Sequence, residues 1–303
     1  MQFSLTVLGS NSALPTSERH PSAQILRVSE RIFLIDCGEG TQFQLRKYHI
    51  NFTRINHIFI SHLHGDHLFG LIGLISTLGL LNRKVDLHIY AHKELEELLT
   101  PHLNFFCSDM AFKVRFHHLN TQEKEVILVD KHITVESFPL SHRIPSCGFL
   151  FKEKAQLPNI VKEAIPKYQL SIQDIVRIKN GEPFLDANGE IVDRDELVVE
   201  PPAPRSFAYC SDTKFFRRII DHIKGVSLLY HEATFTHELK DLAKKSQHTT
   251  ALQAGTLAKE SEVQQLLIGH FSSRYRDVSV FEAEAQTVFP NTIAVHDGFT
   301  YEF

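Results

Sequence analysis

A short run of metal-binding side chains constrains this chain more than any other feature. Residues 62–67 hold three histidines and one aspartate, directly after an apolar stretch that predicts a buried strand. Side chains two apart on an extended chain share a face, so His62 and His64 can point to the same side, while Asp66 and His67 follow on a turn or first helical turn. Imidazole and carboxylate suit zinc and similar ions, so the run predicts ligands for two metals. A solvated histidine-rich loop is the alternative, and it leaves this spacing behind a strand signal unexplained.

Composition limits the class of protein. The 303 residues, 43% hydrophobic and 22% charged, predict one large globular domain with room for an insertion. The formal net charge of −4 argues against a surface coated in positive charge for nucleic acid, but leaves room for a local basic patch. No apolar run approaches the ~20 residues that span a bilayer, no signal peptide is recognisable, and the four cysteines show no paired spacing. We therefore expect no membrane association and a cytoplasmic location.

The hydrophobic pattern alternates between strands and helices. Strands with near-continuous apolar residues, interrupted by helical segments, predict a layered α/β architecture in which helices bury a sheet core. Strands are expected over residues 3–8, 23–28, 31–36, 55–61, 86–90, 112–117, 132–139, 147–151, 206–211 and 263–269, and helices over 68–81 and after a loop within 38–48.

Residues 152–205 differ from the rest of the chain. They hold six prolines, many charges and few apolar runs, so we interpret them as an inserted arm within a single domain of residues 1–303, with a short helix around residues 171–178. A floppy surface excursion is the alternative. A segment this long within a compact domain is usually functional when it is ordered.

Further candidate ligands stand where predicted strands end. His142, Asp212 and His270 each follow an apolar run, and open sheets place their chemistry at such positions. With the four residues of the first run they make seven ligands in the pattern of a two-metal site. Ten histidines fall in no motif and are expected at the surface or satisfied in the core: His49, His57, His88, His92, His102, His117, His118, His132, His222 and His237.

The order of these ligands resembles the metallo-β-lactamase superfamily. Several other stretches resemble one branch of it, the tRNA 3′-processing endonuclease family called ribonuclease Z, and the resemblance runs from about residue 3 to 300. The stretches that resemble this branch are residues 36–41 (DCGEGT), 231–235 (HEATF), 248–250 (HTT), 270–275 (HFSSRY) and 296–298 (HDG).

The resemblance implies a four-layer αβ/βα sandwich with two zinc ions per subunit at one edge of its sheets. Asp212 is expected to bridge the two ions, and a hydroxide between them is expected to attack phosphorus in line. The implied ligands are His62, His64 and His142 for one zinc ion, and Asp66, His67 and His270 for the other.

Catalysis also needs proton transfers. Asp66 can orient or deprotonate the attacking water. The leaving 3′-oxygen needs a proton, and His248, oriented by Glu232, is the predicted donor, because a histidine paired with a carboxylate suits general acid work near neutral pH. The candidate phosphate contacts are Ser272, Arg274 and Thr249.

The function implied by the resemblance is cleavage of precursor tRNA on the 3′ side near the discriminator nucleotide, which leaves a 3′-hydroxyl on the tRNA. The family works as a homodimer in which one subunit's arm grips the tRNA processed by the other. Structured RNA is expected to be read mainly through its shape and backbone.

Two stretches depart from the family pattern. Members often carry a Pro-x-Lys-x-Arg-Asn loop linked to the treatment of a CCA tail, whereas this chain has Ser17 and His20 in place of the lysine and asparagine. The family arm often carries a Gly-Pro motif. Here that dipeptide is missing, and residues 166–170 (PKYQL) stand near its place.

Two other classes of function remain open. A related enzyme acting on a small substrate, above all a phosphodiesterase, would use the same metals, but would have no reason to carry the arm. A lactamase fits less well, since such enzymes commonly place cysteine where Asp212 stands. A non-catalytic RNA-binding or scaffold protein is the third reading, and degenerate proteins of that kind usually lose ligands that this chain retains.

Overall fold

The computed structural model describes residues 3–303, which form two compact units. The first unit combines the chain up to Lys152 with Arg205–Phe303, and the second is Glu153–Pro204. Within the described residues, no helix is long and apolar enough to cross a membrane.

In the described part of the first unit, seven strands form one sheet in the order β16-β1-β2-β3-β4-β5-β6. Strands β3 to β6 run parallel, whereas β16, β1, β2 and β3 pair antiparallel. The strands are β16 (Thr300–Glu302), β1 (Phe3–Gly9), β2 (Ala23–Val28), β3 (Arg31–Cys37), β4 (Ile55–Phe59), β5 (Leu87–Ala91) and β6 (Val114–His118).

A second sheet of seven described strands has the order β15-β14-β13-β12-β9-β8-β7. Strands β12 to β15 run parallel, and β9 pairs antiparallel with β12. The strands are β15 (Thr292–Ala294), β14 (Gln265–Gly269), β13 (Leu228–Glu232), β12 (Ser206–Cys210), β9 (Cys147–Glu153), β8 (Ile133–Pro139) and β7 (Glu125–Val129).

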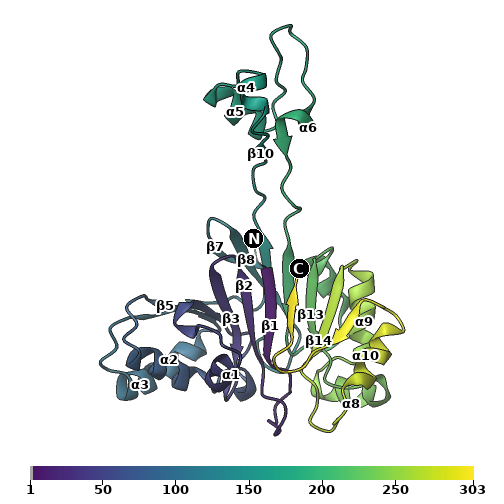
Figure 1. Cartoon of the computed structure of the whole chain (residues 1–303). Coiled ribbons are helices and arrows are strands. Elements are labelled where there is room, and N and C mark those ends of the chain that lie inside the picture. Colours follow the sequence, from purple (N-terminus) through teal and green to yellow (C-terminus); the bar gives the residue numbers. More distant parts are fainter. Residues whose placement is uncertain (1–2) are drawn as a thin grey trace. The chain divides into compact units, whose positions relative to one another are not determined.

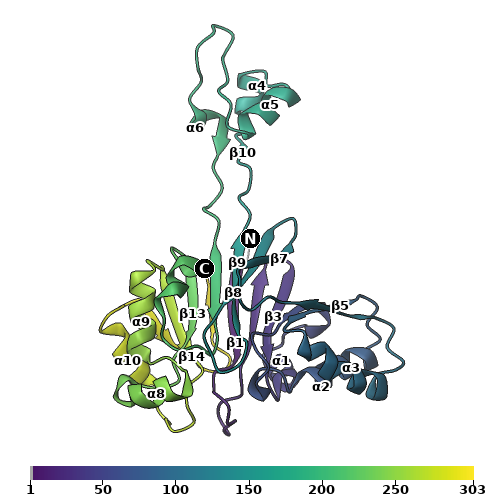
Figure 2. The same cartoon turned by 180° about the vertical axis from the view of Figure 1, so that it is seen from behind.

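Helices cover the outer face of each sheet, with α1 to α3 on one flank and α8 to α10 on the other (Figures 1 and 2). The longer helices of this unit are α1 (Thr41–Lys47), α2 (Leu71–Leu80), α3 (Glu94–Phe106), α8 (Lys240–Ser246), α9 (Ala251–Glu260) and α10 (Ser279–Gln286). Its shorter helices are η1 (Phe52–Arg54), η2 (Gly65–His67), η3 (Arg217–Ile219), α7 (Ile220–Ile223) and η4 (His237–Leu239).

Three apolar clusters hold these layers together. Successive side chains of a strand face opposite sides of the sheet, so Ile58 of β4 packs under α2 and α3, while Phe59 packs between the two sheets with Phe149 and Tyr209. A third cluster lies between the second sheet and helices α7, α9 and α10. The expected four-layer αβ/βα sandwich is therefore confirmed.

The second unit has a small core of its own. It contains the two-stranded sheet of β10 (Asn159–Ile160) and β11 (Val198–Val199), and helices α4 (Ala164–Lys167), α5 (Ile172–Lys179) and α6 (Arg194–Leu197). Ser171 and Asp174 form a capping box at the start of α5. Five buried side chains make the core: Ala164, Leu170, Ile178, Leu197 and Val198.

Element ends differ from the sequence expectations near the histidine run. The strand expected to reach residue 61 ends at Phe59, and the following helix begins at Leu71 rather than at residue 68. The reason is the 3-10 turn Gly65–His67, which takes up the residues between them. The elements of the first unit that were not predicted include helices α3, α8, α9 and α10 and strands β7, β13, β15 and β16.

Candidate metal centre

Loops that follow the strands of both sheets bring the predicted ligands together at one place in the first unit. The loop after β4 carries His62 and His64 and continues into the 3-10 turn that holds Asp66 and His67. His142 follows β8, Asp212 follows β12 and His270 follows β14.

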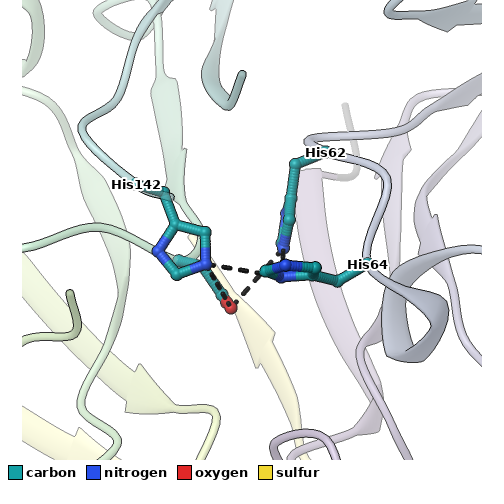
Figure 3. Close-up of side chains that lie close together, drawn as sticks. His62, His64 and His142 are labelled. Atoms are coloured by element: carbon teal, nitrogen blue, oxygen red, sulfur yellow. Dashed lines mark hydrogen bonds and ion pairs between the residues drawn. The ribbon is translucent and has the colours of Figure 1, made fainter. Parts of the chain in front are cut away.

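Three histidines and one carboxylate form the first cluster (Figure 3). The Nδ1 atom of His64 lies 3.0 Å from Nε2 of His62 and 3.3 Å from Nε2 of His142. The Oδ2 atom of Asp212 lies 3.5 Å from Nε2 of His62 and 3.7 Å from Nε2 of His142. Four ligands about 2.1 Å from a tetrahedral zinc ion would lie about 3.4 Å apart, which matches this spacing.

The second cluster uses the other oxygen of the same carboxylate. Oδ1 of Asp212 lies 3.4 Å from Nε2 of His67 and 3.1 Å from Nε2 of His270. Oδ2 of Asp66 lies 3.3 Å and 3.5 Å from the same two nitrogens. Asp212 therefore presents one oxygen to each cluster, as a ligand shared by two ions would.

The chemistry of both clusters fits divalent cations. Among the described residues, three buried atoms that face the second cluster have no hydrogen-bond partner: Nε2 of His67, Oδ1 of Asp212 and Nε2 of His270. Buried polar atoms are rarely left unpaired, so a bound ion would satisfy all three. The structure thus contains candidate metal sites formed by histidine and aspartate.

In the first cluster, protonation states favour the same fit. Burial lowers the pKa of His64 and of His142 to about 4, so both rings are neutral near pH 7, which is the form that binds a metal. Burial opposes charge on Asp66 and Asp212, but the imidazoles around them hold the pKa of both carboxyl groups well below its usual range. Two buried negative charges in one place require positive charge beside them.

Several residues without an assigned role in the sequence analysis orient the ligands. The buried Asp36 accepts hydrogen bonds from Nδ1 of His67 at 2.8 Å and from the hydroxyl of Tyr209 at 2.7 Å. The backbone carbonyl of Gln247 lies 3.0 Å from Nδ1 of His142. In both histidines this leaves Nε2 free to face the cluster. Asp36 has a positive φ of 55°, and His270 has one of 61°, so two site residues adopt the left-handed conformation.

Glu232 is the centre of a buried hydrogen-bond network next to the second cluster. Its Oε1 atom lies 2.9 Å from Nδ1 of His248 and accepts a hydrogen bond from the backbone N–H of Thr249. Its Oε2 atom accepts from the backbone N–H and the hydroxyl of Thr234. Thr234 was not predicted, yet its hydroxyl also lies 3.0 Å from Nδ1 of His270 and so links the carboxylate to a candidate ligand.

The pairing controls the charge of His248. Burial disfavours its protonated form, but the charge and hydrogen bond of Glu232 outweigh burial and raise the pKa of His248 to about 9. The imidazole therefore carries a proton near neutral pH. Because Nδ1 is bound to Glu232, the proton available to a substrate is the one on Nε2.

A cavity of about 470 Å³ opens onto both clusters. Ser272 and Arg274 line it, so two predicted phosphate contacts lie where a substrate could reach them. Thr249 does not line this cavity. It is buried, and its hydroxyl donates to the carbonyl of Thr213 at 2.7 Å, so the expectation of a phosphate contact from its side chain is corrected to a supporting role through its N–H.

The loop that departs from the family pattern is fixed beside this cavity. Nδ1 of His20, one of the two residues in this loop that differ from the pattern of the resembled family, lies 2.9 Å from Oδ2 of Asp297. The guanidinium of Arg19 donates to Asn11 and to the carbonyl of Tyr275. Arg19 therefore holds the loop in place, and Ser17 is exposed on it.

Comparison with known proteins gives three kinds of match. Residues 3–159 match the family model described as Anti-Pycsar protein Apyc1. The chain is 50% identical over 292 residues to ribonuclease Z of Bacteroides fragilis (strain YCH46), covering 96% of both, and 44% identical over 295 residues to ribonuclease Z of Porphyromonas gingivalis (strain W83), covering 97% of both.

Solved structures show the same fold. The short form of human tRNase Z matches with a TM-score of 0.71 and 26% identity over 98% of both chains. The metallo-β-lactamase fold protein YhfI from Bacillus subtilis matches with a TM-score of 0.72 and 17% identity over the full length of both. The match to the Apyc1 family model includes five of the seven candidate ligands. The matches to the ribonuclease Z relatives extend over nearly the whole chain.

Proposed function

The chain belongs to the ribonuclease Z family and is an endoribonuclease, and we propose that it cuts precursor tRNA on the 3′ side near the discriminator nucleotide, with two zinc ions per subunit. The observation that carries this proposal is the shared carboxylate of Asp212, with one oxygen facing three histidines and the other facing His67 and His270. Four buried cysteines without disulfides suit the cytoplasm, where we expect the enzyme to work.

The side chains of the site divide into those that would hold metal ions and those that would take part in the reaction. His62, His64 and His142 would hold one ion, Asp66, His67 and His270 the other, with Asp212 between them. When bound, two such ions lower the pKa of a water molecule and withdraw charge from phosphate oxygens. The Asp66 carboxylate, kept ionised by its neighbours, orients the attacking water.

The leaving group is served by a different residue. When the P–O3′ bond breaks, the 3′-oxygen that remains on the tRNA takes a proton, and Nε2 of His248 supplies it. Glu232 keeps that imidazole protonated and oriented. Arg274 and Ser272, at the wall of the same cavity, contact the phosphates on either side of the cut.

The second unit is proposed to grip tRNA, and the active form to be a homodimer. Its α5 helix is amphipathic, with Ile172 and Val176 exposed on one side. Lys167 is 2.6 Å from Glu196, and Arg177 is 2.7 Å from Glu182, so part of the positive charge of this unit is held in ion pairs. Binding of folded RNA would then rely on shape as well as on charge.

A substrate comparison tests this function. We expect the purified protein to cut a folded precursor tRNA once, and EDTA to stop the reaction. The same RNA with a scrambled sequence that cannot fold is the matched control, because it has equal charge and length. Hydrolysis of bis(p-nitrophenyl) phosphate without any tRNA cut would instead assign the site to a small phosphodiester.

A further inference from the structure

A second cavity adjoins the candidate active site. It measures about 410 Å³ and is lined by Lys214, Phe215, Lys240, Asp241, Lys244, Gln253 and His248. The last of these residues, His248, also lines the cavity above the two metal clusters, so one imidazole separates the two spaces. Three lysines and a single aspartate are among these lining residues, which gives the second cavity a net positive charge.

The chain segments that build this cavity are tied to the catalytic groups. Lys240 and Lys244 lie on one face of α8 because they are four residues apart. That helix ends at Ser246, the next residue, Gln247, has a positive φ of 58°, and the N–H of His248 bonds to the carbonyl of Ala243. Helix α8 and the residues at its end therefore hold the imidazole of His248 close to Lys240 and Lys244.

The third lysine that lines this cavity, Lys214, comes from the loop after β12 and not from α8. Lys214 stands two residues after Asp212, and its backbone N–H donates to the carbonyl of Ser141. Lys214, Lys240 and Lys244 are exposed, so their ammonium groups can meet a ligand. Like charges four apart on a helix repel each other, so the placement of Lys240 and Lys244 on one face of α8 does not serve the fold.

The chemistry of the cut indicates which part of the RNA lies beside this cavity. The oxygen that His248 protonates is the 3′-oxygen, and it stays with the part of the RNA upstream of the cut. The upstream nucleotides must therefore approach the metal clusters past His248. From this geometry we propose that Lys214, Lys240 and Lys244 bind backbone phosphates of the upstream strand, at the 3′ end of the tRNA body, and not those of the trailer. This inference rests on the proposed function and adds to it the path of one strand.

Binding of the product tests the inference without catalysis. The ligand is a tRNA that ends in a 3′-hydroxyl at the discriminator, and its Kd is measured by fluorescence anisotropy between 50 and 200 mM salt. Each lost phosphate contact lowers the slope of log Kd against log salt by about 0.7 for a single strand. The variant K214A/K240A/K244A should therefore show a slope smaller by about two, which corresponds to roughly twentyfold less loss of affinity over this salt range.

A matched control variant separates phosphate binding at this cavity from the general effect of removing positive charge. K224A/K245A/K259A removes three exposed lysines that are not among the residues lining either cavity, and Lys245 is on the same helix as Lys244. This control should bind like the unmodified protein. Both variants should hydrolyse bis(p-nitrophenyl) phosphate at the unmodified rate, which shows that the metal clusters are intact.

Cleavage assays then test whether the lysines bind the RNA upstream of the cut or the trailer downstream of it. Precursors with a trailer of one nucleotide and of about 20 nucleotides should lose the same factor in kcat/KM in the lysine variant. A loss that disappears with the short trailer would show that the lysines hold the trailer, and would overturn the inference alone. Equal slopes for the two triple variants would also overturn it. If the unmodified protein cuts neither precursor, the proposed function fails and this inference fails with it.

Discussion

Oε1 of Glu232 lies 2.9 Å from Nδ1 of His248, and His248 lines both the cavity above the metal clusters and the lysine-lined cavity. The carboxylate is fully buried, and backbone N–H groups of Thr213, Thr234 and Thr249 also donate to it. It is therefore held in one position before any substrate binds. A carboxylate fixed in this way sets both the tautomer and the proton content of the imidazole.

Replacing His248 should separate proton donation from metal binding. We expect His248→Ala to retain bound metal, because the ring is paired with Glu232 and is not one of the seven ligands proposed for the two ions. We expect it to cut precursor tRNA ~10²–10⁴-fold more slowly, the usual contribution of a general acid. Hydrolysis of bis(p-nitrophenyl) phosphate should change little, since nitrophenolate leaves without needing a proton. Stopped-flow or gel assays on both substrates measure the two rates.

The rate at which His248→Ala cuts tRNA decides whether His248 is the proton donor. An unchanged rate in His248→Ala would refute the donor role. Equal losses on both substrates would mean that the substitution disturbs the metal clusters instead. His237→Ala is the matched control, because His237 lies nearby on η4 and is not among the residues that line the cavity.

Glu232 has a structural as well as a chemical task. Glu232→Ala leaves three buried backbone N–H groups without their acceptor, and each unsatisfied group costs about 1–3 kcal/mol. We therefore expect this variant to lower the free energy of unfolding in urea as well as to slow cleavage by ~10²–10⁴-fold. A loss of activity with no loss of stability would contradict the network described above.

Metal removal should weaken the fold as well as stop the reaction. Ions that bind only the native state stabilise it by mass action, by about 2.7 kcal/mol at a hundred times their Kd. His64→Ala removes one of the three histidines of the first cluster, so it should lower the metal content measured by mass spectrometry and reduce the rise in Tm on adding zinc. His118→Ala, an exposed histidine paired with Glu96, is the control. An unchanged metal content in His64→Ala would remove it from the ligand set.

The structure makes Gly38 a sensitive position. A Cβ atom added there would lie 2.4 Å from the backbone oxygen of Asp66 and 2.6 Å from Cβ of Pro21. Neither neighbour is the end of a flexible side chain, so Gly38→Ala must displace the turn that carries Asp66. We expect a loss of about 1–3 kcal/mol in stability, as for overpacked cores, and weaker zinc binding by calorimetry.

Gly73 provides the comparison. A Cβ atom there would lie 3.3 Å from Nε2 of Gln42, a side-chain end that can move, and Gly73 is within helix α2. Gly73→Ala should keep zinc affinity and raise stability by about 0.5–1 kcal/mol. If both alanine variants bound zinc like the unmodified protein, the contact of Gly38 with the turn would have no influence on the site.

A row of aromatic rings on the first sheet predicts a dependence of stability on pH. His57 stacks on His88 with ring centroids 5.1 Å apart, and His88 stacks on His117 at 5.2 Å. Burial, and then the neighbouring imidazoles, lower the pKa of His57 from its ordinary 6.5 to about 4. The unfolded chain thus binds more protons than the native one between these two values.

The sign of the effect follows from that difference. The contribution of His57 to stability is complete above about pH 6.5 and is lost as the pH falls towards 4. His57→Gln cannot titrate, so its urea midpoint should fall less than that of the unmodified protein over this interval. His102→Gln, which replaces an exposed histidine, should leave the dependence unchanged. Parallel curves for His57→Gln and the unmodified protein would contradict the prediction.

Much of the fold was predictable because its signals are local. Ile58 to His67 combine an apolar strand with closely spaced ligands, and both patterns can be read from neighbouring residues. Asp212 and His270 could be predicted only as residues at strand ends, and the resemblance assigned them to the site. Asp36 and Thr234 lie in stretches that resemble the family, but their roles depend on contacts with His67 and His270, far along the chain, so the sequence assigned them none.

Other features depend on side-chain placement that no pattern encodes. Thr249 stands beside His248 in the sequence, yet its hydroxyl is turned into the interior towards Thr213. Lys214 and Lys244 are 30 residues apart, and only the packing of α8 beside the loop after β12 brings them to one cavity. Helix α3 was missed although it spans 13 residues, because Pro101 within it is a residue that normally ends helices.

The most direct test of the central claim is to map both new ends after a single cut. Precursor tRNA with and without an encoded CCA would be incubated with the zinc-loaded protein and sequenced at the 3′ end of the tRNA and the 5′ end of the trailer. We predict one cut near the discriminator, with a 3′-hydroxyl on the tRNA and a 5′-phosphate on the trailer, as attack by water at phosphorus and proton donation to the 3′-oxygen require. A cyclic or 3′-phosphate end, or cuts scattered along the trailer, would contradict this account.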